Sequence, residues 1–145
     1  METGIKVGDC MKSSLVTVPD STPVVLAARK IAETGVGSLL VESSQKGTYG
    51  IVTERDLVVK VLAMGKTDSK VRDICTKTLI TIPREADISQ AATLMGERNV
   101  KRIVVTEGGK IVGIVSQKDL ISIAPSLYDF ISEPPMPKPT KLRVY

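Results

Sequence analysis

Two short runs of apolar, mostly β-branched residues, each ended by a proline, open the two halves of the chain. The first is Leu15–Val18 before Pro19, and the second is Leu79–Ile82 before Pro83. Short runs rich in Val, Ile and Thr are typical of β-strands, and proline interrupts the ladder of hydrogen bonds. The pattern therefore predicts one short strand at the start of each half.

An amphipathic helix is predicted after each strand. Apolar residues recur there at spacings of three and four, which places them on one helical face. Thr22 is a suitable N-cap, with Pro23 at the first helical position. The predicted buried faces are Val24, Ala27, Ala28, Ile31 and Ala32 in the first half and Ile88, Ala91, Ala92 and Met95 in the second.

A hairpin and a second helix complete each half. The hairpin strands are predicted at 38–41 with 49–53 and at 102–105 with 111–116, and Gly108-Gly109 is typical of a tight hairpin turn. The second helix begins at Glu54 or Gln117. In the first half it ends near Gly65, and its apolar face is Leu57, Val58, Val61 and Leu62; in the second half Pro125 ends it.

The two halves are copies of one another. Val7–Val41 aligns without a gap on Val71–Val105, and after the central loop Gly50–Leu57 aligns on Gly113–Leu120. Repetition of this length indicates internal duplication. Each copy is too small to bury a sufficient core, so the copies are expected to share one. The predicted fold class is α/β (α+β), with two repeats of strand, helix, strand, strand, helix related by a pseudo-twofold axis.

Composition narrows the chemistry. The chain has no histidine and no tryptophan, which disfavours His-based catalysis and base-stacking platforms. Cys10 and Cys75 lack the further ligands of a zinc site and are expected to be reduced, structural thiols. The net charge of +4 favours anionic partners, but the basic residues are dispersed. We find no membrane-spanning run or signal-peptide pattern, so the expected location is cytoplasmic.

A hydroxyl residue followed three positions later by aspartate stands at the start of each second helix. These pairs are Thr53 with Asp56 and Ser116 with Asp119, both preceded by Gly-Ile-Val. The spacing fits a capping box, which stabilises a helix start. Its occurrence in both halves also fits a ligand site, in which the glycine leaves a phosphate-accepting corner beside the helix N-terminus, the hydroxyl donates to phosphate and the carboxylate accepts from a ribose diol. Both interpretations stay open.

The duplicated unit ending in this motif resembles the cystathionine-β-synthase (CBS) domain, and the pair resembles a Bateman module. The resemblance covers about residues 5–124. It implies a first repeat at 5–65 and a second at 66–125, followed by a C-terminal tail at 126–145 that is proline-rich at Pro134–Pro139.

The resemblance also implies further site residues. Gly37-Ser38 and Lys101-Arg102 occupy the position that faces ligand phosphates in the family, which makes the Asp119 site the expected principal phosphate site; the alternative for the basic pair is a solvated surface. Met11–Val16 is expected to help enclose the Asp119 site, and Cys75–Ile80 the Asp56 site. Arg55 and Lys118 are either phosphate contacts or exposed residues. The segments expected to flank adenine are Leu15 with Val16 and Leu79 with Ile80, for which core packing is the alternative.

These features predict a non-catalytic regulatory module. Adenine nucleotides, AMP first and also ADP or ATP, are expected to bind in clefts between the repeats and to shift the conformation read by an unidentified regulated protein. A homodimer is expected. The alternatives are a sensor of S-adenosylmethionine or a dinucleotide, and a nucleic-acid-binding protein using Lys138, Lys141 and Arg143, which the dispersed charge does not favour. No catalytic cofactor is expected.

Overall fold

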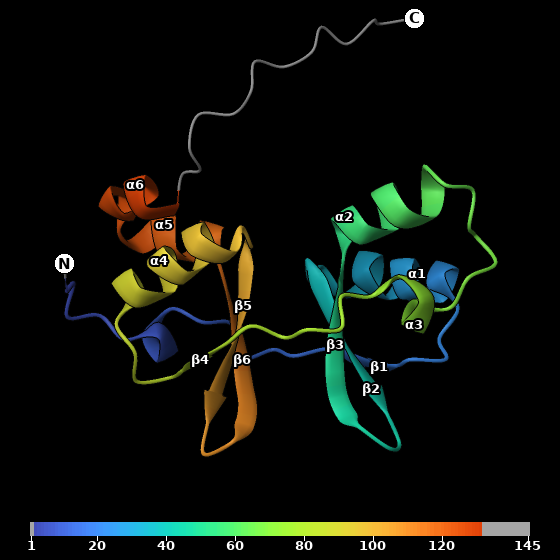
Figure 1. Cartoon of the computed structure of the whole chain (residues 1–145), viewed down its shortest axis with the longest axis horizontal. Coiled ribbons are helices and arrows are strands. Elements are labelled where there is room, and N and C mark those ends of the chain that lie inside the picture. Colours follow the sequence, from blue (N-terminus) through green and yellow to red (C-terminus); the bar gives the residue numbers. More distant parts are fainter. Residues whose placement is uncertain (1, 132–145) are drawn as a thin grey trace, which may run out of the picture. The chain divides into compact units, whose positions relative to one another are not determined.

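Each repeat builds a three-stranded sheet in which one edge strand is parallel to its neighbour and a hairpin supplies the rest (Figure 1). The computed structural model describes residues 2–131. In the first sheet, β1 (Thr17–Pro19) runs parallel to β2 (Ser38–Ser43), which is antiparallel to β3 (Gly47–Thr53). In the second, β4 (Thr81–Pro83), β5 (Arg102–Glu107) and β6 (Lys110–Ser116) repeat this order. The predicted α+β class and both hairpins are confirmed.

The edge strands β1 and β4 begin two residues later than predicted and include the proline. Each pairs on one side only, so the missing proline N–H breaks no essential ladder bond. Pro19 lies opposite Glu42 at the end of the ladder. The residues expected to start these strands instead precede them and are half-buried: Leu15, Val16, Leu79 and Ile80.

The first helix of each repeat follows its strand as predicted, but the two are buried differently. In α4 (Ile88–Arg98) all four predicted apolar residues are buried. In α1 (Val24–Thr34) the buried residues are Val24, Ala27 and Ile31, whereas Ala28 and Ala32 are exposed. The cap also differs from the prediction, because Pro23 rather than Thr22 occupies the N-cap of α1.

The second helix of the first repeat is wound differently from that of the second. It starts as α2 (Glu54–Asp56) and continues as a π-helical stretch, η2 (Leu57–Leu62), whereas α5 (Gln117–Ile123) is α-helical throughout. Leu57 and Val61 pack into the core, but Val58 and Leu62 are exposed, so the predicted apolar face was too wide. Only the narrow stripe made by the four-residue spacing reaches the sheet.

The first residues of the predicted tail are folded. From Pro125 the chain forms a 3-10 turn, η3 (Pro125–Leu127), and then a short helix, α6 (Tyr128–Ile131), that packs against α4. Leu127 and Ile131 are buried, because this segment supplies apolar residues to the second repeat. The proline-rich part of the tail lies outside the described residues.

The segment leading into each repeat packs with the other repeat. One compact unit is Ser13–Ile80, and the other combines Met1–Lys12 with the chain from Thr81 onward. The short helices η1 (Val7–Asp9) and α3 (Val71–Ile74) mark the exchanged segments. The N–H of Val7 donates to the carbonyl of Ala86 at 2.8 Å, and that of Val71 donates to Thr22 at 2.8 Å. The same local structure therefore occurs in both units.

Candidate functional site

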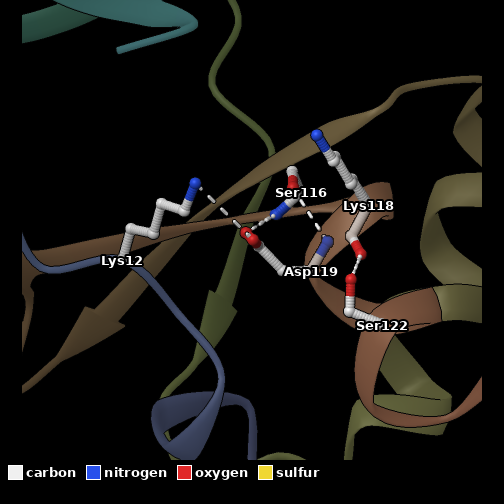
Figure 2. Close-up of polar contacts among 5 residues, drawn as sticks. All are labelled: Lys12, Ser116, Lys118, Asp119 and Ser122. Carbon is white, nitrogen blue, oxygen red and sulfur yellow. Dashed lines mark hydrogen bonds and ion pairs between the residues drawn. The ribbon is translucent and has the colours of Figure 1, made fainter. Parts of the chain in front are cut away.

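The Ser116–Asp119 pair closes a complete capping box at the start of α5 (Figure 2). The Ser116 N–H donates to Oδ2 of Asp119 at 2.9 Å, and the Asp119 N–H donates to Oγ of Ser116 at 3.1 Å. This leaves Oδ1 of Asp119 and the hydroxyl hydrogen of Ser116 outside the box. The structural and ligand-binding interpretations are therefore compatible, because each uses different atoms of the same residues.

The Thr53–Asp56 pair has the same geometry at the start of α2. The Thr53 N–H donates to Oδ2 of Asp56 at 2.9 Å, and the Asp56 N–H donates to Oγ1 of Thr53 at 3.2 Å. The side chains of Asp56 and Asp119 are 13% and 14% exposed. Both carboxylates are thus mostly buried, and in each the capping box uses Oδ2 and leaves Oδ1 outside it.

The hairpins place the predicted phosphate residues directly beside these hydroxyls. Arg102 lies opposite Ser116 in the β5–β6 ladder, and Ser38 lies opposite Thr53 in the β2–β3 ladder. The carbonyl of Lys101 accepts the N–H of Gln117 at 2.8 Å, which ties the basic pair to the first turn of α5. At the matching position the carbonyl of Gly37 accepts from Glu54 at 3.3 Å. The second repeat therefore has a basic pair where the first has Gly37 and a buried Ser38.

The exchanged segments run along β6 and β3 next to the motifs. Lys12 and Ile114 exchange backbone hydrogen bonds of 2.9 and 3.0 Å, and Thr76 and Ile51 exchange bonds of the same lengths. Met11 belongs to the same unit as Asp119, and Leu79 and Ile80 belong to that of Asp56. Leu15 and Val16 also fall in the unit of Asp56, and Val16 packs against its core. Enclosure of a ligand by these residues stays a prediction.

The motif glycines lie where an exchanged segment passes close to each hairpin. Gly113 is buried within β6, and a Cβ there would collide with Met11 and come within 3.0 Å of the Lys12 carbonyl. At Gly50 a Cβ would lie 3.0 Å from the Thr76 carbonyl and 3.1 Å from Sγ of Cys75. These glycines let an exchanged segment cross the strand closely. Their part in a phosphate-accepting corner stays a prediction.

Two lysines that the sequence analysis did not single out contact the motif carboxylates. Nζ of Lys12 lies 3.9 Å from Oδ1 of Asp119, and Nζ of Lys60 lies 3.1 Å from Oδ1 of Asp56. The i,i+4 spacing of Asp56 and Lys60 could have indicated the second pair. The Lys12–Asp119 pair joins residues far apart in the sequence. The only indication of it in the sequence was that Lys12 directly follows Met11, a predicted site residue.

The basic residues inside the motifs are at the surface. Arg55 and Lys118 are exposed, and the carbonyl of Lys118 accepts the hydroxyl of Ser122 at 2.8 Å. In Figure 2 the ammonium groups of Lys12 and Lys118 lie to either side of Ser116 and Asp119. Lys101 and Arg102 lie next to this site along the backbone, since Arg102 pairs with Ser116 and the carbonyl of Lys101 accepts from Gln117.

Both cysteines are free, and the charge of Asp119 acts on Cys10 as that of Asp56 acts on Cys75. Burial, together with the charges of Asp119 and Asp9, raises the pKa of the Cys10 thiol to about 11. Burial also raises the pKa of Cys75, against the opposing effect of Lys77. Because the thiolate is the reactive form, both thiols are protonated and poorly nucleophilic at neutral pH.

A shallow groove of about 310 Å³ borders the site along α5, lined by Gln117, Lys118, Ile121 and Ser122. A larger groove of about 450 Å³ lies on α4, and no predicted site residue lines it. Among residues 2–131, no three His, Cys, Asp or Glu side chains gather closely enough to hold a metal ion. None of the described helices combines the length and hydropathy needed to cross a membrane.

Comparison with known proteins gives a consistent result. The family model of the CBS domain matches residues 7–63 and again residues 71–126. An uncharacterized protein of Methanopyrus kandleri is 33% identical over 132 residues, which cover 89% of this chain and 67% of that protein. An uncharacterized conserved protein from Pyrococcus horikoshii has a similar structure, with a TM-score of 0.78, 32% identity and coverage of 86% of this chain and 95% of that one. A hexameric CBS-CP12 protein from bloom-forming cyanobacteria gives a TM-score of 0.76 at 28% identity, covering 86% and 73%.

Proposed function

The chain belongs to the CBS domain family, and we propose that it is a non-catalytic regulatory module that binds adenine nucleotides. AMP is the first candidate ligand, and ADP and ATP are the alternatives. Binding would shift the conformational equilibrium of the module, and a separate protein would respond to the shift. The principal site is the one at Asp119.

The observation that supports this proposal best is that the capping box at the start of α5 leaves one carboxylate oxygen of Asp119 and the hydroxyl hydrogen of Ser116 unused. Oδ1 of Asp119 lies outside the capping box and is suited to accept hydrogen bonds from the two hydroxyls of a ribose. The hydroxyl of Ser116 is suited to donate to a phosphate oxygen. Lys101 and Arg102, at the start of β5, add the positive charge that a phosphate requires.

The difference in charge between the two repeats favours the Asp119 site. Each charge-assisted hydrogen bond to phosphate contributes about 1.5–3 kcal/mol, and the first repeat has Gly37 and Ser38 where the second has the basic pair. One such contact corresponds to about a tenfold or larger difference in affinity. A phosphorylated ligand should therefore occupy the second repeat first.

Assembly into a homodimer is part of the proposal. Several large apolar side chains of α1 and η2 are exposed, and contiguous exposed apolar surface is typical of association sites. The cyanobacterial relative is described as hexameric, which is consistent with association of such modules. The exposed residues are Val25 and Leu26 of α1 and Val58, Val59 and Leu62 of η2, followed by Met64 just after η2.

Isothermal titration of the protein with AMP, ATP and S-adenosylmethionine tests the proposal. We expect AMP to bind, and Asp119→Asn to weaken binding by about tenfold or more, because a neutral amide accepts more weakly from the ribose. Asparagine still accepts the capping hydrogen bond, so the fold should be kept. Tighter binding of S-adenosylmethionine than of AMP would contradict the role assigned to the basic pair, and no binding of any nucleotide would contradict the function.

A further inference from the structure

Asp56 and Asp119 differ in the cation that lies beside Oδ1, the oxygen outside the capping box. In the first repeat, Nζ of Lys60 lies 3.1 Å from Oδ1 of Asp56 and also donates to the carbonyl of Ile74 at 3.1 Å. The lysine side chain is 44% exposed, so it is partly packed in this position. Lys60 is thus held by two partners at hydrogen-bond distance.

The corresponding arrangement in the second repeat is much looser. Nζ of Lys12 lies 3.9 Å from Oδ1 of Asp119, beyond hydrogen-bond distance, and its side chain is 78% exposed. In the alignment of the two motifs, the position of Lys60 is occupied by Ile123, which carries no charge. The first repeat therefore contains a fixed internal cation at its carboxylate that the second repeat lacks.

A ribose diol and Lys60 would compete for the same oxygen of Asp56. A nucleotide that used this oxygen would have to break the ion pair, and the displaced ammonium would lose its bond to Ile74 as well. The remaining oxygen, Oδ2, already accepts the Thr53 N–H in the capping box. At this site, unlike at Asp119, both carboxylate oxygens already have a partner at hydrogen-bond distance, so the diol would have to compete with a partly packed ammonium group.

We propose that Lys60 is a specificity-determining residue that occupies Asp56 internally and keeps adenine nucleotide out of the first site. Each chain then binds one nucleotide, at Asp119. The inference rests on the proposed function and extends it, because it names the residue that makes the duplicated sites unequal.

Titration with AMP of variants that swap Lys60 and Ile123 between the repeats tests the inference. Lys60→Ile is expected to raise the stoichiometry from one to two AMP per chain. In the Asp119→Asn background, the same substitution should restore binding with an affinity at least about tenfold above that of Asp119→Asn alone. The reciprocal Ile123→Lys should weaken the Asp119 site by a similar factor. Both positions are partly exposed, so both variants should fold.

Two controls separate the ion pair from net charge and from packing. Lys66→Ile removes the same charge from an exposed position in the same unit and should leave the stoichiometry at one. Lys60→Arg keeps a cation on the helix and should also leave it at one. Thermal unfolding of each variant checks that the fold is retained.

The outcomes distinguish the inference from the function it rests on. Failure of the unmodified protein to bind AMP, ADP or ATP would overturn the proposed function. Two equivalents bound by the unmodified protein would overturn the role of Lys60 and leave the function standing. The role of Lys60 would also be overturned if the unmodified protein and Lys60→Ile each bound one equivalent. Weaker binding to Lys60→Ile would overturn it too, and would make Lys60 a phosphate contact instead.

Discussion

Asp87 joins the N-terminal residues of the chain to the first helix of the second repeat. Its carboxylate accepts the Ser89 N–H at 2.8 Å and thereby caps α4. The same carboxylate accepts the N–H of Gly4 at 2.8 Å and both the N–H and the hydroxyl of Thr3. The aligned position of the first repeat holds Pro23, which has no such side chain. One residue therefore fixes the start of the chain to the second repeat only.

This arrangement predicts an acid-sensitive contribution to stability. Although burial alone would raise it, hydrogen bonds from Ser89 and Thr3 hold the pKa of Asp87 well below its usual 3.8. A carboxyl whose pKa is lower in the folded state stabilises the protein above its unfolded pKa, and the contribution is lost as pH falls from there toward the folded pKa. Thermal unfolding from pH 6 downward should show a fall in Tm that begins near pH 4 (about the unfolded pKa) and is smaller in Asp87→Asn. Asp68→Asn, at an exposed position of the other unit, is the control. Parallel curves for the wild type and Asp87→Asn would contradict this role.

At the scale of single residues, the sequence reveals local pairs better than distant ones. The Ser116–Asp119 and Thr53–Asp56 pairs are readable because both members lie within one helical turn. Lys12 comes close to Asp119 only because the first segment of the chain runs along β6. The role of Gly113 depends on the same crossing, so its close contact with Met11 and Lys12 could not be read from the motif.

The first helices of the two repeats also differ in what covers them. α6 packs against α4 at Gly96, where an added Cβ would collide with the Phe130 carbonyl. The aligned residue of α1 is Ala32, which is exposed. The sequence predicted both helices from the same periodicity. It could not predict that α6 covers α4, because Pro125 and the prolines after Glu133 made residues 126–131 resemble a tail.

Gly96→Ala tests whether α6 packs closely on α4. In an open helix this change would stabilise by about 1 kcal/mol, because alanine has the higher helix propensity. Here the collision is with backbone atoms that cannot rotate away, so we expect a net destabilisation of about 1–3 kcal/mol by urea unfolding. Chymotrypsin should also cleave faster after Tyr128 and Phe130. The reciprocal Ala32→Gly should cost only the helix propensity, about 1 kcal/mol. A stabilised Gly96→Ala protein would show that α6 does not dock here.

The molecule as a whole is organised by the exchange of leading segments. The sequence repeats begin near residues 5 and 66, but the compact units divide the chain after Lys12 and after Ile80. Lys6 pairs with Asp87 and Lys70 with Pro23, at equivalent points of the two units. Periodicity and motif spacing report local structure, so they predicted the elements of each repeat and gave no information on which repeat each leading segment joins.

Proline substitution at the two crossing points tests this exchange. Lys12→Pro removes the N–H that donates to Ile114 in β6, and Thr76→Pro removes the N–H that donates to Ile51 in β3, both at 2.9 Å. Lys12 belongs to the first repeat by sequence but contacts the second, and Thr76 belongs to the second but contacts the first. Each variant should therefore loosen the repeat that it contacts. Hydrogen exchange followed by mass spectrometry should be faster by about tenfold or more in β6 for Lys12→Pro and in β3 for Thr76→Pro. The other strand should be unchanged in each variant. A loss of about 1.4 kcal/mol of local stability raises the open population tenfold, which sets the expected size of the effect. Faster exchange of β3 in Lys12→Pro would mean that the first segment packs with its own repeat, and the two units would then be the simple halves of the sequence.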